Sequence, residues 1–163
     1  MARLVLSDAS PLIAVSLIGR LDLLSALFGP ITITEVVQAE LLADGDRPGQ
    51  AVIAAAISAT QIRVIANSRT EPALLALDEG EASTLRVAIH NVGPCLIVID
   101  EPAGRAVAAE YGIPHTGTVG VILQAKKRAL IPSVRTVFEE LLAQEFRIAA
   151  GIIKKALILA GED

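Results

Sequence analysis

Aromatic residues are scarce in this chain: they make up 2% of the sequence, and tryptophan is missing altogether. Proteins that bind single-stranded nucleic acids stack bases on aromatic rings, so this composition argues against recognition by stacking. Hydrophobic residues still make up 53% of the chain. The core must therefore be built from Ala, Val, Leu and Ile, which favours an α/β or α-helical interior.

Cysteine and histidine are also rare, with one Cys (Cys95) and two His (His90 and His115). A single cysteine excludes an internal disulfide and fits a reducing compartment, so we expect a cytoplasmic protein. So few nitrogen and sulfur ligands also make a zinc site a poor expectation.

Long apolar runs are missing too, although the mean hydropathy is high at +0.59. A membrane-spanning helix needs about 18 apolar residues, and the longest candidate, Ala51 to Ala59, is much shorter. We therefore expect no membrane partner and attribute the hydrophobicity to a well-filled core and an oligomer interface. The net charge of −4 argues against a broad basic surface for nucleic acid. It leaves open an enzyme that holds cations in an acidic pocket.

Short apolar runs alternate with helical patterns along the whole chain. The pattern predicts an α/β fold, a three-layer α/β/α sandwich with a mainly parallel sheet of about five strands, in one domain over 1–163. We expect Ser10 and Thr34 to cap the helices that follow them, and Thr118 also fits a helix cap. The expected strands are 3–7, 31–33, 62–66, 95–99 and 113–116; the expected helices are 10–19, 20–29, 35–43, 50–60, 80–90, 103–112, 118–130, 134–144 and 149–159.

Carboxylates follow two of the predicted strands at the point where each strand leaves the core. Asp8 ends the first strand, and Asp100 and Glu101 end the strand "CLIVI". Ligand sites of parallel sheets lie beyond the carboxyl ends of the strands, so these acids meet if the two strands are neighbours. A turn or cap role is the alternative for Asp8.

Two further acids fall on apolar helix faces. Glu40 shares a face with Val36 and Val37, and Glu81 is aligned with Leu85. A carboxylate on a core face is costly unless it is paired, protonated or bound to a metal. In isolation such a residue is more often a rim residue or half of an ion pair.

Asp78 would join the face of Glu81 if its helix began early, whereas Glu79 is expected to face solvent.

Oxygen ligands without His or Cys suit hard cations such as Mg²⁺ or Mn²⁺. A two-metal carboxylate site is one solution for hydrolysing phosphodiesters. Arg105 is the nearest cation in sequence; it could pair with Asp100 or Glu101, or hold a substrate phosphate.

Four stretches together resemble the PIN domain, a family of metal-dependent ribonucleases that includes the VapC-type toxins. They are "LSDASPLI", "TEVVQAEL", "LDEGEASTLRVA" and "VIDEPAGRAVAAEYGIPHTGTVGVILQAKKRALIP". The last resembles a poorly characterised branch of predicted nucleic-acid-binding proteins. The resemblance covers about Leu4 to Pro132, so we treat 133–163 as a C-terminal helical extension that packs on the domain, supports a dimer or shields the site.

The resemblance implies a PIN-like fold with an acidic pocket for Mg²⁺ or Mn²⁺. Glu101 falls where this branch often carries a second aspartate, so its direct metal role is open. Ser10 matches a small hydroxyl near the site. The implied catalytic and metal-binding residues are Asp8, Glu40, Glu81 and Asp100, with Glu101 as a further metal residue and Ser10, Arg105, Thr116 and Thr118 as substrate-binding residues.

The first functional hypothesis is a metal-dependent endoribonuclease that hydrolyses RNA, the toxin of a toxin–antitoxin pair with an antitoxin protein as partner, and a homodimer. A second is a non-catalytic PIN-like module that binds RNA or a partner. A third is a receiver-type phosphoryl-transfer domain, disfavoured because the strand "IPHTG" ends without a lysine. The cluster Lys126 to Arg128 is expected to complement a helix dipole rather than to contact RNA.

Overall fold

The computed structural model describes residues 2–67 and 69–163 and contains one sheet of five parallel strands. The order across the sheet is β3-β2-β1-β4-β5, which confirms the predicted α/β architecture. Receiver domains have the strand order 2-1-3-4-5, so the topology overturns the receiver-type alternative. The strands are β1 (Leu4–Ser7), β2 (Ile31–Thr34), β3 (Ile62–Ile65), β4 (Cys95–Val98) and β5 (His115–Thr116).

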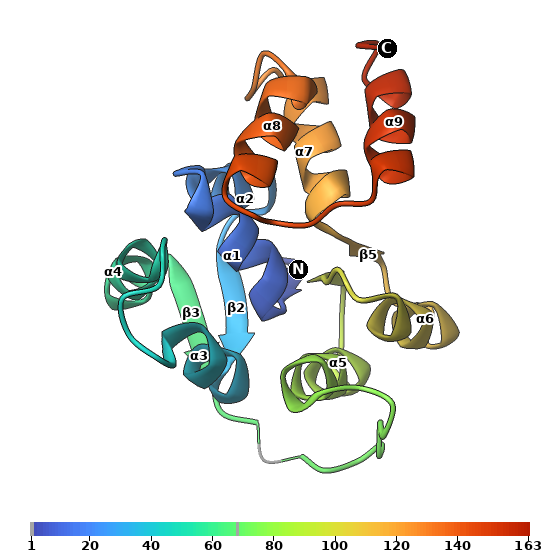
Figure 1. Cartoon of the computed structure of the whole chain (residues 1–163). Helices are drawn as coiled ribbons and strands as arrows, with labels where there is room; N and C mark the ends of the chain where they lie inside the picture. The colour runs from blue at the N-terminus through green and yellow to red at the C-terminus, as the bar shows by residue number, and fades with distance from the viewer. Residues whose placement is uncertain (1, 68) are drawn as a thin grey trace.

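Helices cover both faces of the sheet, as Figure 1 shows. Side chains alternate along the strands: Val5 and Val98 belong to one buried cluster, and Leu6 and Ile97 belong to the other. The larger cluster takes in α1 (Ala9–Leu17), α2 (Asp22–Phe28), α3 (Glu35–Leu42), α4 (Gln50–Ser58) and α7 (Thr118–Lys127). The smaller one lies under α5 (Glu79–His90) and α6 (Pro102–Glu110).

The chain ends in α8 (Val134–Ala143) and α9 (Ala150–Leu159), which stand beside α7 at the top of Figure 1. Phe138, Leu141 and Ala156 lie in the same buried cluster as the sheet residue Val5. These two helices are thus part of the main core. None of the helices in the described residues has the length and apolarity that a membrane span requires.

The register of β1 and β4 brings their following acids together. Ser7 lies opposite Val98, so both strands end at the same level. The backbone N–H of Asp8 donates to the carbonyl oxygen of Val98 at 2.9 Å. Asp8 and Asp100 therefore leave the sheet side by side at its carboxyl edge, as the sequence predicted.

Two of the predicted helix caps are wrong. Thr34 does cap α3, since its hydroxyl accepts from the backbone N–H of Val37. However, α1 begins at Ala9 with Asp8 as its cap residue, and α7 begins at Thr118 after Gly117. Ser10 and Thr118 lie inside the first turns of their helices, and their hydroxyl groups donate to Asp100 instead of capping a helix.

Candidate active site

Asp100 is held by hydroxyl and backbone donors from two helices. Ser10 Oγ donates to its Oδ2 at 2.7 Å. Thr118 donates from its backbone N–H to Oδ1 at 2.7 Å and from its hydroxyl to Oδ2 at 2.8 Å. Two of the predicted substrate-binding residues thus contact a predicted metal ligand and fix its orientation.

The first turn of α5 positions Glu81. Thr84 Oγ1 donates to the carbonyl oxygen of Gly80 at 2.8 Å, and the hydroxyls of Thr34 and Ser83 are 2.8 Å apart. The first bond lies within α5, and the second fastens the helix start to the end of β2. Glu81 is 5% exposed, so its predicted place on a core face is confirmed.

Carboxylates from three segments converge on Gly80. A Cβ atom on this glycine would lie 2.6 Å from Glu40 Oε2, 3.3 Å from Asp8 Oδ1 and 3.4 Å from Asp78 Oδ1. No L side chain fits there unless these oxygens move. Gly80 is therefore a site of close approach, where a missing side chain leaves space for oxygen atoms.

The expected burial of Glu40 on a core face is wrong, because its side chain is exposed. The buried stripe of α3 is narrow and consists of Val37 and Leu41, one helical turn apart. Glu40 lies next to this stripe, at the rim of the site. Arg47 Nη2 donates to the main-chain oxygens of Glu40 and Leu41 at 2.6 and 3.2 Å and so caps the end of the helix.

Burial and mutual repulsion shift the titration of these acids. Desolvation, with smaller contributions from Asp78, Glu40 and Asp100, raises the pKa of Asp8 to about 6. Desolvation followed by the charges of Asp78 and Asp8 raises the pKa of Glu81 to about 7. Partial desolvation of the carboxyl group, followed by the charge of Asp78, also raises the pKa of Glu40 although the residue as a whole is exposed. The site therefore has more negative charge than its own cations offset.

Asp8 has an oxygen atom without a partner. The residue is 5% exposed, and its Oδ1 is buried with no hydrogen-bond donor. An unpaired carboxylate oxygen of this kind is the position that a cation would satisfy. The all-oxygen donor set around it also fits Mg²⁺ or Mn²⁺. Within 2–67 and 69–163, however, no three acidic, His or Cys side chains already form a ligand group, so carboxylates must rotate to share one ion.

The remaining predicted residues flank Asp100. A Cβ on Gly117 would lie 2.8 Å from Asp100 Oδ1 and 3.3 Å from Arg105 Nη1, so Arg105 reaches the same place. Among the ion pairs of the described residues, none joins Arg105 to Asp100 or Glu101, which disfavours the pairing role. Glu101 is exposed at the start of α6, and Thr116 ends β5 half-buried.

Asp78 is the acid that sequence reasoning left outside the site. Its Oδ1 accepts the backbone N–H of Glu81 at 2.8 Å, which makes it the N-cap of α5. The spacing in "DEGE" resembles a capping box, so a local explanation is complete without any ligand. Glu79, in contrast, is exposed as predicted, with 76% of its side chain accessible.

A family model described as a PIN domain matches residues 4–162. This chain belongs to the PIN domain family. The match includes the C-terminal helices that the earlier resemblance left out. PIN domains are typically nucleases and are commonly metal-dependent, which agrees with an acidic carboxyl edge. A search of curated proteins and a search of solved structures gave no match.

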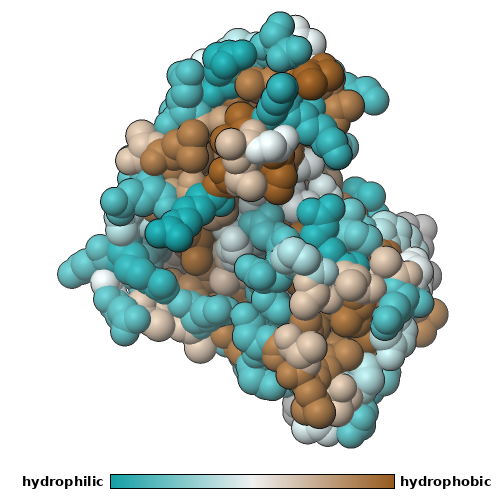
Figure 2. Space-filling view, turned by 45° about the vertical axis from the view of Figure 1, so that its right-hand side comes forward, coloured by the Kyte–Doolittle hydropathy of each residue, from teal (hydrophilic) through white to brown (hydrophobic). Residues whose placement is uncertain are grey.

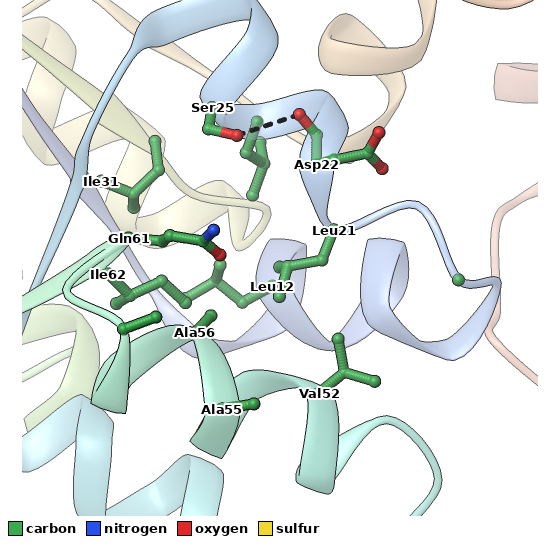
Figure 3. A pocket seen from close by; sticks show the side chains of 13 residues that line it. Leu12, Leu21, Asp22, Ser25, Ile31, Val52, Ala55, Ala56, Gln61 and Ile62 are labelled. Carbon is green, nitrogen blue, oxygen red and sulfur yellow. Dashed lines mark hydrogen bonds between the residues drawn. The ribbon is translucent and has the colours of Figure 1, made fainter.

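The other features of this PIN domain lie away from the acidic edge. Lys126 Nζ pairs with Glu162 at 3.3 Å, and Arg128 donates to the Leu27 carbonyl, so the basic cluster serves the fold. A largely apolar hollow of about 520 Å³ lies at the amino ends of β2 and β3, lined by Leu12, Ile62 and their neighbours (Figure 3). Figure 2 shows hydrophilic residues across the middle of one face, between apolar patches above and below.

Proposed function

We propose that this PIN domain is an endoribonuclease that depends on Mg²⁺ or Mn²⁺ and hydrolyses phosphodiester bonds of RNA. The observation that carries the proposal is the buried Oδ1 of Asp8. This oxygen accepts no hydrogen bond, and other carboxylates lie near it. Such a site is unfavourable for the protein alone and becomes favourable when a cation binds. Family membership supports the nuclease class.

Asp8, Glu40, Glu81 and Asp100 are the residues that would hold the metal. A divalent cation bound there supplies the positive charge that stabilises a phosphate during hydrolysis. The raised pKa values, about 6 for Asp8 and about 7 for Glu81, mean that both carboxyls keep their protons to a higher pH than usual, and each must be deprotonated to act as a ligand. Ser10 and Thr118 keep the two oxygens of Asp100 in place.

Arg105 is the residue that we assign to the substrate backbone. Arg105 is exposed, its Nη1 borders the same point above Gly117 as Asp100 Oδ1, and it has no ion pair to Asp100, so its donors are available to a phosphate. The scarcity of aromatic residues means that contacts to the backbone, rather than base stacking, provide affinity. Thr116 and Glu101 stay predicted contributors that follow from the resemblance.

The biological role that we propose beyond RNA hydrolysis follows from the resemblance to VapC-type toxins. It comprises toxin activity, an antitoxin protein as partner, a homodimer and a cytoplasmic location. A non-catalytic PIN-like module that binds RNA or a partner is the second candidate. The absence of a ready-made group of three ligands in the described residues favours that alternative.

Cleavage of a mixed RNA pool by the purified protein separates these two functions. Reactions contain Mn²⁺, Mg²⁺ or EDTA, and an Asp8→Asn/Asp100→Asn double variant is purified in parallel as a control for contaminating nucleases. We expect cleavage with either metal, none with EDTA, and a loss of at least about a hundredfold in the variant. Equal cleavage by both proteins, or none by the wild type, would contradict the nuclease assignment.

A further inference from the structure

Asp78 belongs to none of the roles described so far except the N-cap of α5. Its Oδ1 accepts the backbone N–H of Glu81 at 2.8 Å. The same atom lies 3.4 Å from the place where a Cβ on Gly80 would stand. Glu40 Oε2 and Asp8 Oδ1 surround that place at 2.6 and 3.3 Å. Three carboxylates thus border one small space.

A cap at this position does not need a negative charge. Ser, Thr and Asn cap helices about as well as Asp, because the cap requires only an oxygen that accepts a backbone N–H. Favourable interaction with the helix dipole adds only a modest stabilisation. Against it stands the crowding of Asp78 Oδ1 with the carboxylate oxygens of Glu40 and Asp8 around Gly80, where like charges repel. The charge of Asp78 is therefore a cost that capping alone does not explain.

The unpaired oxygen of Asp8 supplies an independent observation at the same place. Asp8 Oδ1 is buried and has no donor, and it borders the space above Gly80. The nearest basic residue on this side, Arg47, directs Nη2 to two main-chain oxygens of α3 rather than into the space. No side chain of the described residues donates to Asp8 Oδ1, so this oxygen is available to a ligand.

We propose that Asp78 helps to hold a divalent cation in the space above Gly80, together with Asp8, Glu40 and Glu81. The inference rests on the proposed function and adds a fifth acid to its metal site. Capping occupies one lone pair of Oδ1, the oxygen that borders this space, and leaves the second lone pair of the same atom for the ion. A hard cation such as Mg²⁺ or Mn²⁺ is the class of ligand that such oxygens select.

Binding of Mn²⁺ alone, measured by calorimetry on the full chain, tests the assignment without an activity assay. Asp78→Asn and Asp78→Ser keep a cap oxygen and remove the charge. Glu79→Gln is the matched control, since it removes one charge from the adjacent residue, whose exposed side chain lies 3.7 Å from Arg86 Nη1. We expect the Kd for Mn²⁺ to rise at least tenfold in both Asp78 variants and to stay within twofold in the control.

The possible failures have different meanings. Mn²⁺ binding by the wild type that persists unchanged in both Asp78 variants would overturn this inference and leave the proposed function standing. A wild type that binds no Mn²⁺ would overturn both. Loss of folding in both variants, seen by circular dichroism, would show that the charge serves the fold itself and would also overturn the assignment.

Discussion

Thr118 binds Asp100 twice, with its backbone N–H on Oδ1 at 2.7 Å and its hydroxyl on Oδ2 at 2.8 Å. The two residues come from different elements, since Asp100 follows β4 and Thr118 begins α7. Together with the hydroxyl of Ser10, this pair of bonds leaves the carboxylate little rotational freedom. A ligand that is oriented in advance loses less entropy when a metal binds.

Removal of the Thr118 hydroxyl is therefore expected to weaken the site without unfolding the protein. Thr118→Val deletes the bond to Oδ2 but keeps the backbone bond to Oδ1. Substitution of such supporting groups typically costs about 10–100-fold in metal affinity or activity. Thr118→Ser is the control that keeps the hydroxyl. Equal Mn²⁺ affinity and cleavage rates in all three proteins would contradict this role.

Gly80→Ala tests the space that the acids share. The new methyl group would meet Glu40 Oε2 at 2.6 Å, and this exposed side chain can swing away at low cost. We expect the helix to gain up to about 1 kcal/mol from alanine propensity while the Kd for Mn²⁺ rises several-fold. Gly151→Ala is the matched control, since Gly151 is also the second residue of its helix and meets no atom within 4 Å. An unchanged Kd in Gly80→Ala would refute the interpretation.

Metal-free protein should lose stability as the pH rises from about 4 to above 6. The pKa of Asp8 is raised from 3.8 to about 6, so the folded state binds its proton more tightly than the unfolded state. The resulting stabilisation is complete below about pH 4 and is lost as the pH passes 6. A rise of about two in the pKa of Asp8 corresponds to about 3 kcal/mol of folding free energy. Denaturant unfolding in EDTA at pH 4 to 8 measures it.

The difference between wild type and Asp8→Asn reports this contribution together with the part of the Glu81 pKa shift that the Asp8 charge causes, because asparagine does not titrate. Addition of Mg²⁺ should restore the stability of the wild type at pH 7.5 and have little effect on the variant. A wild-type stability that rises relative to the variant over the same pH range would contradict the assignment of a raised pKa.

Glu162 is expected to stabilise the C-terminal helices. It accepts hydrogen bonds from Ser133 Oγ and the backbone N–H groups of Val134 and Arg135, and these bonds, with that of Val134 the largest, lower its pKa to about 2. The stabilisation is present above its ordinary pKa and is lost as the pH falls toward 2. Glu162→Gln should lower the melting temperature by a few degrees at pH 7, and by less at pH 3. A pH-independent difference would argue against a role of the charge.

The carboxyl-edge acids were accessible from sequence because their positions depend on local pattern and sheet geometry. An apolar run that ends in Asp8 or Asp100 predicts a buried strand followed by an acid, and parallel strands place both at one edge. Glu81 followed in the same way from helical periodicity. These predictions needed no knowledge of distant contacts beyond the pairing of two strands.

The remainder depends on tertiary contacts. Ser10 and Thr118 were assigned to helix caps because the pattern around them is local, whereas their partner Asp100 is 90 and 18 residues away. Glu40 lies beside a stripe whose width is set by neighbouring elements rather than by α3 itself. Asp78 was missed because its capping role fully accounts for its place in the sequence.

The central claim, that the acidic edge binds the cation used for RNA hydrolysis, is tested most directly by one titration. The Mn²⁺ concentration is varied while calorimetric binding and the rate of RNA cleavage are measured on the same preparation. We predict that both reach half-saturation at the same concentration and that Asp8→Asn/Asp100→Asn abolishes both. Cleavage that is complete in EDTA, or metal binding that survives in the double variant, would contradict the account.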